Sequence, residues 1–308
     1  MTGVTASAPG KVVLSGEYAV LGGAPAVSMA VNRRATATVH TIDGDDHVLD
    51  VAGTAVPGDF ALFDAVVGQV CPRGDTRFHA RLDTTAFAEG GRKLGIGSSA
   101  AIAVALAAAL DPDGRATLEN AFAAHARLQG GVGSGIDVAT SATGGLIGFR
   151  RGAPVSVIDW PARLSYALLW SGVPASTSAR VRAADMSAGT IVRRTLDERA
   201  AAAAEAWASG DAGRVLAATA AYADALRAFS DEQDLDVFAA GHDAMSRAAD
   251  RQGLVYKPCG AGGGDVGIVL GRDDDSVASF AESAEARGFR KLDIVLDPDG
   301  VRVTRQES

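Results

Sequence analysis

Glycine-rich segments constrain the fold of this chain more than any other feature of its sequence. Of 308 residues 37 are glycine, and eight of these glycines fall in three segments, 8–21, 93–101 and 257–265. Glycine weakens helices and strands by about 0.5–1 kcal/mol relative to alanine, so a cluster of glycines inside an ordered protein indicates a loop whose backbone something approaches closely. The sequence therefore predicts three specialised loops.

Composition and charge exclude several classes of protein. The 29 basic against 37 acidic residues give a formal net charge of −8, which argues against a nucleic-acid partner. Two cysteines permit neither a disulfide framework nor a cysteine-rich zinc site, and the five histidines have no metal-ligand spacing. The most apolar stretch, 100–110, is shorter than the about 20 residues of a membrane span. No signal peptide is visible at the first residues, so we expect a soluble cytoplasmic protein with no membrane partner.

The hydrophobic pattern predicts an α+β protein with two lobes, 1–153 and 154–308. Strand-like segments are 4–6, 11–15, 26–40, 78–87, 155–160, 166–170, 266–270, 291–296 and 301–304. Helix-like segments are 60–70, 100–110, 117–128, an alanine-rich region within 179–251, and 276–287. Strands and helices are mixed in both halves, which is typical of an α+β protein.

The middle glycine segment leads directly into an apolar helix. Its residues Lys93, Gly95, Gly97, Ser98, Ser99 and Ala100 form the candidate site. The first turn of a helix has unpaired N–H groups and a partial positive charge, which together favour a bound phosphate. Either serine could cap the helix or offer its hydroxyl to Mg²⁺. A plain glycine turn is the alternative.

Two familiar nucleotide-binding motifs fit poorly. A Walker A loop built on Gly10 and Lys11 would have Thr5 in place of its first glycine and Val12 in place of its serine or threonine. A Rossmann fingerprint at Gly95 should follow a buried strand, but the preceding segment 88–93 is polar. The sequence therefore supports neither a Walker A loop nor a dinucleotide-binding loop.

Taken in order, the three glycine segments resemble the three motifs of the GHMP kinases, the superfamily that includes galactokinase, homoserine kinase, mevalonate kinase and phosphomevalonate kinase. Within this superfamily, parts of the first and third glycine segments and one further segment, 129–139, resemble the phosphomevalonate kinase branch. Their sequences are GEYAVL at 16–21, QGGVGSGIDVA at 129–139 and KPCGAGGGDVGI at 257–268. The joint match covers essentially the whole chain. A single one of these motifs would be unspecific.

The resemblance implies a two-lobed fold, with an N-terminal lobe like ribosomal protein S5 domain 2 and a ferredoxin-like C-terminal lobe, and a site between them. It implies an ATP-dependent, Mg²⁺-dependent enzyme that phosphorylates 5-phosphomevalonate to 5-diphosphomevalonate. Mevalonate kinase, or another small-molecule kinase of this superfamily, is the alternative. From a different class, the chain could be a catalytically inactive ligand-binding member. The expected partner is a small phosphorylated molecule, and the protein is expected to be a monomer or a homodimer.

The resemblance also assigns roles to residues. Lys11 and Asp137 would be catalytic, and the segment from Lys93 to Ala100 would bind the ATP phosphates, with Ser99 near Mg²⁺. The residues implied in substrate binding are Tyr18, Ser134, Gly135, Ser176, Thr177, Lys257, Gly260, Ala261 and Gly262. Arginines that could hold a substrate phosphate are Arg150, Arg151, Arg180 and Arg182.

Three points qualify these roles. Asp137 could instead cap a helix after Gly135. Glu119 is the only carboxylate near the place where mevalonate kinases carry a metal-binding glutamate, so we expect Mg²⁺ to rest on serine, water and nucleotide. His125 is expected only to pack within its helix.

Overall fold

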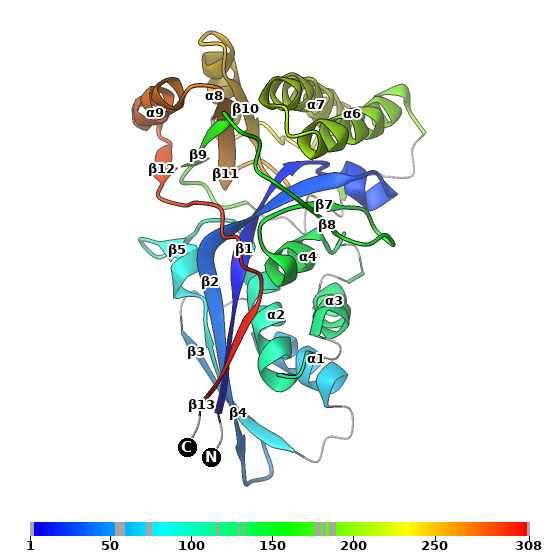
Figure 1. The fold of residues 1–308 in the computed structure, drawn as a ribbon, viewed down its shortest axis with the longest axis vertical. Coiled ribbons are helices and arrows are strands. Elements are labelled where there is room, and N and C mark those ends of the chain that lie inside the picture. The colour runs from blue at the N-terminus through cyan, green and yellow to red at the C-terminus, as the bar shows by residue number, and fades with distance from the viewer. Residues whose placement is uncertain are drawn as a thin grey trace. The chain divides into compact units, whose positions relative to one another are not determined.

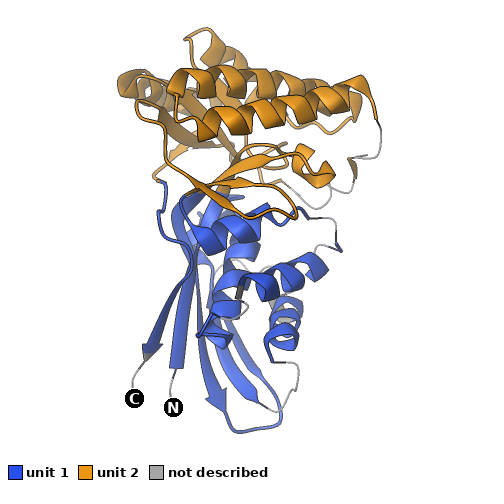
Figure 2. Ribbon diagram, turned by 45° about the vertical axis from the view of Figure 1, so that its right-hand side comes forward, with its two compact units in different colours: residues 1–11, 30–145, 296–308 blue, residues 12–29, 146–295 orange. Residues whose placement is uncertain are grey.

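The computed structural model describes residues 3–52, 59–71, 76–114, 117–128, 130–131, 133–175, 180, 183–184 and 189–306. The chain divides into two compact units, each made of separate pieces of sequence (Figure 2). Unit 1 comprises 1–11, 30–145 and 296–308, and unit 2 comprises 12–29 and 146–295. Most of the predicted N-terminal lobe thus lies in unit 1 and most of the predicted C-terminal lobe in unit 2. Residues 12–29, however, belong to unit 2, and residues 296–308 belong to unit 1. The lobe boundary near residue 153 stays a prediction.

Unit 1 contains a mostly antiparallel sheet with the order β13-β1-β2-β4-β3 (Figure 1). Its strands are β1 (Gly3–Ser15), β2 (Ala26–Ile42), β3 (Val48–Ala52), β4 (Arg77–Asp83) and β13 (Arg302–Gln306). β3 pairs with β4 in parallel, whereas β1 with β13 and β2 with β4 pair antiparallel. Along β2, Ala35, Ala37 and Val39 are buried while the residues between them are not, as the two-residue period of a strand with one covered face requires.

Four helices of unit 1 lie together on one side of its strands (Figure 1). They are α1 (Asp59–Val70), α2 (Ser98–Leu110), α3 (Thr117–Leu128) and α4 (Ile136–Thr143). The helix α2 contacts the other three and is buried at every position from Ala100 to Ala109. A helix that is apolar all round must be enclosed by protein, and its many alanines allow neighbouring helices to approach closely. The start of α2 is therefore held rigidly.

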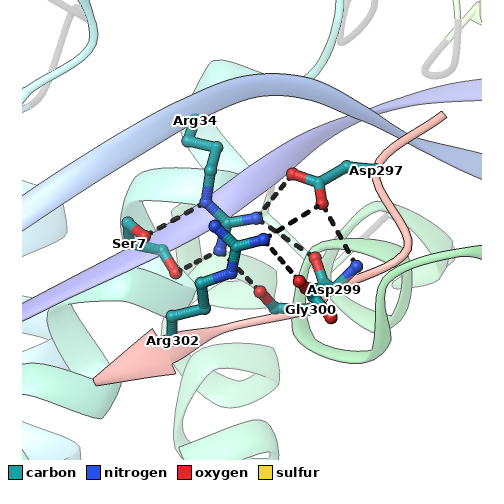
Figure 3. Close-up of polar contacts among 6 residues, drawn as sticks. All are labelled: Ser7, Arg34, Asp297, Asp299, Gly300 and Arg302. Carbon is teal, nitrogen blue, oxygen red and sulfur yellow. Dashed lines mark hydrogen bonds and ion pairs between the residues drawn. The ribbon is translucent and has the colours of Figure 1, made fainter. Parts of the chain in front are cut away.

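The C-terminal segment is fastened to unit 1 by Arg34, as Figure 3 shows. The Arg34 guanidinium donates to Asp297 Oδ2 at 2.6 Å and to the carbonyls of Ser7, Asp299 and Gly300 at 2.8, 3.1 and 2.6 Å. Its Nε donates to Ser7 Oγ at 3.1 Å. Beside this cluster, Val301 N–H donates to the Ala142 carbonyl at the end of α4. The segment thus supports α4 as well as β1.

We predict that Arg34→Ala lowers the free energy of unfolding by about 2–4 kcal/mol, because Oδ2 of the largely buried Asp297 carboxylate and three backbone carbonyls lose the hydrogen bonds that Arg34 donates. Urea denaturation measures the change. The matched control is Arg302→Ala: Arg302 also pairs with Asp297, and with the Asp299 carboxylate, but it is 54% exposed, so its loss is expected to cost less than about 1 kcal/mol. Equal losses would contradict the structural role of Arg34.

Unit 2 contains a four-stranded antiparallel sheet with the order β10-β11-β9-β12. Its strands are β9 (Ser165–Trp170), β10 (Val255–Pro258), β11 (Val266–Gly271) and β12 (Arg290–Leu292). Two further antiparallel strands, β7 (Leu146–Phe149) and β8 (Ser156–Ile158), belong to the same sheet as β2, because β7 pairs with residues Ala26–Met29 at its start. The helices are α6 (Ile191–Ala208), α7 (Ala212–Glu232), α8 (His242–Asp250) and α9 (Asp274–Ser283).

The alanine-rich region forms α6 and α7, which run side by side (Figure 1). Each begins at a side-chain cap: Thr190 accepts from Arg193 N–H and Asp211 from Arg214 N–H. Their facing side chains form one apolar cluster with Tyr18 and Ala19 from the first glycine segment. No helix among the described residues is long and apolar enough to cross a membrane. The cytoplasmic location and the monomer or homodimer stay predictions.

Candidate functional site

In unit 1 the second glycine segment ends at the N-terminus of α2. Gly97 is the N-cap residue, with φ 86°, and Ser98 and Ser99 begin the helix, so neither serine is the cap. No side chain caps this end, and the first turn carries no acidic residue. Gly95, with φ 76°, is exposed, while Lys93 is half-buried in the short strand β6 (Arg92–Lys93). The uncapped N–H groups make this helix end suited to an anion.

Lys11 of β1 is locked against this loop. Its backbone N–H donates to the Ile96 carbonyl at 2.8 Å. A Cβ on Gly97 would lie only 2.9 Å from Lys11 Cγ, so the aliphatic part of Lys11 occupies the space that a side chain at Gly97 would need. The ammonium group ends 3.3 Å from Asp137 Oδ1. The side chain of Lys11 is 9% exposed, which strengthens this ion pair relative to a surface pair.

Asp137 lies in the first turn of α4, whose N-cap residue is Gly135, so Asp137 does not cap the helix. Gly135 has φ 87°, and a Cβ there would meet the Phe122 ring at 2.3 Å. Ser134 Oγ accepts from Ile136 N–H at 3.3 Å, which helps to order the turn before the helix. Gln129 and Val132 of this motif lie outside the described residues. The Asp137 side chain is 24% exposed, so it remains accessible to a ligand.

In unit 2 the first and third glycine segments share a buried ion pair. Lys257 Nζ contacts Glu17 Oε1 and donates to the Pro258 carbonyl at 2.7 Å, and both side chains are almost wholly buried. Tyr222 donates its hydroxyl to the Glu17 carbonyl at 2.8 Å. In this structure the charge of Lys257 is neutralised by Glu17 and enclosed by protein. The substrate contact of Lys257 stays a prediction.

The third glycine loop, 260–264, connects β10 with β11. The Tyr18 hydroxyl donates to the Ala261 carbonyl at 2.7 Å, and burial raises the pKa of Tyr18 well above its usual value, so the hydroxyl stays protonated. Gly260 is half-buried, whereas Ala261 and Gly262 are buried. Tyr18 is predicted to contact substrate, and in this structure its hydroxyl donates to the backbone of this loop.

Arg180 is the predicted phosphate-binding arginine that lies against the third glycine loop. A Cβ on Gly263 would lie 2.0 Å from Arg180 Nη2, so the guanidinium rests directly on this glycine. Its Nε donates to the Leu235 carbonyl at 3.2 Å. Arg150 and Arg151 are exposed in the turn after β7. Ser176, Thr177 and Arg182 lie outside the described residues.

Comparison with known proteins identifies the group to which this chain is similar. No protein-family model matches it. The phosphomevalonate kinase of Streptomyces sp. (strain CL190) is 30% identical over 85% of this chain and 88% of its own length. The mevalonate kinase of Aeropyrum pernix is 28% identical over 91% and 93%. The structure of Streptococcus pneumoniae phosphomevalonate kinase with phosphomevalonate and AMPPNP superposes with TM-score 0.80, at 19% identity, covering 95% and 99%.

The chain belongs to the GHMP kinase family. The predicted α+β GHMP kinase fold is confirmed, and this protein is a small-molecule kinase of the phosphomevalonate kinase-like type. The roles of single residues stay predictions, because similarity of whole chains does not test them.

His125 has a contact in this kinase that was not predicted from the sequence. His125, on α3, is buried, and its Nε2 lies 3.2 Å from Ser99 Oγ at the start of α2. Burial lowers the pKa of His125, while the nearby Asp137 carboxylate opposes this effect and the Lys11 ammonium reinforces it. A neutral imidazole therefore contacts the hydroxyl proposed to lie near the metal. The sequence gives one sign of this contact: His125 is a polar residue on a helix face whose other buried residues, Ala121 and Ala124, are alanines.

We predict that Gly97→Ala reduces turnover by the kinase about 100-fold, because the new Cβ pushes Lys11 away from its place beside the helix end. Steady-state kinetics and nucleotide titration measure the effect. The control is Gly114→Ala at the other end of α2. Gly114 also has a positive φ, 70°, but has nothing within 4 Å, so this variant carries the backbone strain without the clash. Similar turnover in both variants would contradict the role of the Lys11 contact.

Proposed function

We propose that the kinase transfers the γ-phosphoryl group of ATP to the phosphate of 5-phosphomevalonate, yielding ADP and 5-diphosphomevalonate. The observation that carries this proposal is the similarity to the Streptomyces phosphomevalonate kinase over most of both chains. Both the Lys11–Asp137 pair and the uncapped start of α2 are in keeping with phosphoryl transfer.

ATP would bind with its phosphates at the start of α2. Backbone N–H groups there, with Gly95 and Gly97 offering no side chain to obstruct the ligand, suit a polyphosphate. The solved Streptococcus pneumoniae neighbour contains AMPPNP, an ATP analogue, which supports use of ATP here.

The residues near this helix end also fit Mg²⁺ bound to ATP. Among the described residues no cluster of three or more histidine, cysteine or carboxylate side chains could hold a metal alone. Mg²⁺ is commonly held by one or two protein oxygens together with phosphate oxygens and water. The Ser99 hydroxyl would supply a protein oxygen, and Glu119 is exposed on α3. Bound Mg²⁺ would neutralise charge on the phosphates.

Lys11 and Asp137 would act on the transferred group. As the bond between the β,γ-bridging oxygen and the γ-phosphorus breaks and an acceptor oxygen bonds to that phosphorus, the Lys11 ammonium stabilises the negative charge on the equatorial oxygens. Asp137 holds that ammonium at 3.3 Å. A phosphate monoester has a second pKa of about 6, so the acceptor is mostly a dianion at neutral pH and needs little help from a base. Orienting Lys11 is therefore the main role we assign to Asp137.

An anionic acceptor also needs positive charge of its own, because two phosphates repel each other. The Arg180 guanidinium on Gly263 would supply it, since a guanidinium binds phosphate through paired hydrogen bonds.

Mevalonate is the second candidate acceptor, because the Aeropyrum pernix relative and others are mevalonate kinases. A neutral hydroxyl must lose a proton on transfer, so Asp137 would then serve as the general base. A coupled ADP-release assay with 5-phosphomevalonate and mevalonate in parallel separates the two. We expect turnover with 5-phosphomevalonate to dominate. Turnover with mevalonate alone would replace the proposal with the alternative, and turnover with neither would refute both.

We predict that Arg180→Met lowers kcat/KM for 5-phosphomevalonate about 10- to 100-fold, since a charge-assisted hydrogen bond to phosphate is lost. The activity without acceptor and the affinity for ATP should stay unchanged. The matched control is Arg194→Met, because Arg194 is also an arginine of unit 2 that donates to a backbone carbonyl, that of Gly189, at an exposed place on α6. Loss of ATP affinity in Arg180→Met, or an equal loss in both variants, would argue against an acceptor-phosphate site.

A further inference from the structure

The third glycine loop is held through its carbonyl groups by two buried side chains. Tyr18 donates its hydroxyl to the Ala261 carbonyl at 2.7 Å, and His242 Nε2 lies 2.9 Å from the Gly264 carbonyl. The two donors come from separate places in unit 2, the first glycine segment and the start of α8. A loop with glycine at 260, 262, 263 and 264 has little conformational preference of its own, so its shape depends on such contacts.

The protonation state of His242 follows from its partners. A carbonyl oxygen only accepts, so Nε2 carries a hydrogen and donates to the Gly264 carbonyl. Burial lowers the pKa of His242 to about 4, an effect that the Gly264 carbonyl opposes and the Lys257 charge reinforces. The imidazole is therefore neutral at ordinary pH, so Nδ1 accepts from the Tyr256 hydroxyl at 2.8 Å.

Tyr18 is held equally firmly. Its ring packs against Phe229 of α7 with centroids 5.6 Å apart, inside the apolar cluster formed by α6 and α7. Its φ of 60° is unusual for a residue other than glycine, which indicates that the surrounding contacts fix its backbone. The hydroxyl thus reaches Ala261 from a rigid support.

These contacts determine which way the loop's peptide groups point. In a planar trans peptide the carbonyl and the following N–H point in opposite directions, so holding the Ala261 carbonyl on Tyr18 turns the Gly262 N–H away from it. The loop is also fixed against residue 237. Gly263 N–H donates to the Val237 carbonyl at 2.7 Å, and the backbone of Gly262 lies so near that a Cβ there would be 2.4 Å from the same oxygen.

Asp265 joins this loop to the segment 171–175. Its N–H donates to the Val173 carbonyl at 2.7 Å, and its own carbonyl accepts from Ser171 N–H at 2.9 Å. Its carboxylate Oδ1 accepts from Ala175 N–H at 3.1 Å. Any shift of the loop is therefore passed directly to the backbone of this segment.

We propose that Tyr18 and His242 are positioning residues, which hold the carbonyls of Ala261 and Gly264 so that the loop 260–264 is preformed for the phosphorylated acceptor. The inference rests on the proposed function for the identity of the acceptor, but not for the state of the loop. A binding loop that is already ordered raises affinity, because no free energy of binding is lost in ordering it. Removing either donor leaves a buried carbonyl unsatisfied and frees the loop.

The first test compares Tyr18→Phe with Tyr222→Phe. Each removes one buried hydroxyl that donates to a backbone carbonyl within the same apolar cluster, but Tyr222 serves Glu17 and not the glycine loop. We expect Tyr18→Phe to raise KM for 5-phosphomevalonate about tenfold, with a smaller change in KM for ATP. Amide hydrogen exchange of a peptide covering 259–265 should become faster in Tyr18→Phe but not in Tyr222→Phe. Unchanged loop exchange in Tyr18→Phe, or the same acceleration in both variants, would overturn the proposal.

The second test compares His242→Gln with His242→Leu. A glutamine amide can still donate to the Gly264 carbonyl, whereas leucine cannot. We expect His242→Leu to accelerate loop exchange and raise the acceptor KM as Tyr18→Phe does, and His242→Gln to restore part of both. If the two variants behave alike while thermal unfolding shows both folded, His242 contributes bulk and not its hydrogen bond, and its assignment fails.

These readouts separate the inference from the proposed function. Wild-type protein that turns over only mevalonate would refute phosphomevalonate as the acceptor, yet faster loop exchange in Tyr18→Phe would still support the positioning role. Conversely, turnover of 5-phosphomevalonate with normal loop exchange in both Tyr18→Phe and His242→Leu would leave the proposed function standing and refute the inference.

Discussion

The close packing of Lys11 on Gly97 is the constraint on which the arrangement of unit 1 depends. Any side chain at residue 97 would occupy the path of the lysine, and the N–H of Lys11 is bonded to the neighbouring Ile96 carbonyl. Through this contact β1 and the start of α2 are fixed together. The Lys11 ammonium is thereby placed beside Asp137 on α4, so that one cation, one carboxylate and an uncapped helix end come from three separate elements.

Supporting contacts lie behind each of these groups. Gly135 lets Phe122 pack against the turn before Asp137, and the C-terminal segment held by Arg34 supports the far end of α4. In unit 2 the same logic applies to the third glycine loop, where buried tyrosine and histidine side chains satisfy carbonyls that the loop cannot pair within itself. Glycine permits the close approach, and polar groups from other elements then specify a single conformation.

Part of this organisation was predictable because it is local. The phosphate loop and helix α2 follow from glycines, serines and an apolar run that are adjacent in sequence, and the family motifs pointed to Lys11 and Asp137. Other predictions were only partly right. The strand predicted for 291–296 ends at Leu292, although Ile294 is still buried between exposed neighbours, because the alternation of apolar residues reports burial and not hydrogen-bonded pairing. The helix predicted for 276–287 ends as α9 at Ser283 and is followed by a short 3₁₀ turn, 285–287.

The sequence by itself determined the class of the protein: an α+β kinase of this family with three glycine loops, one of them at a helix start. Only the tertiary structure decided which charges are available. Lys257 looked like a free cation until Glu17, 240 residues away, proved to neutralise it, and His125 looked like a packing residue until α2 brought Ser99 to its ring. The reason is physical. A local pattern fixes backbone conformation, whereas the protonation, pairing and accessibility of a side chain depend on neighbours that the folded chain brings from distant positions.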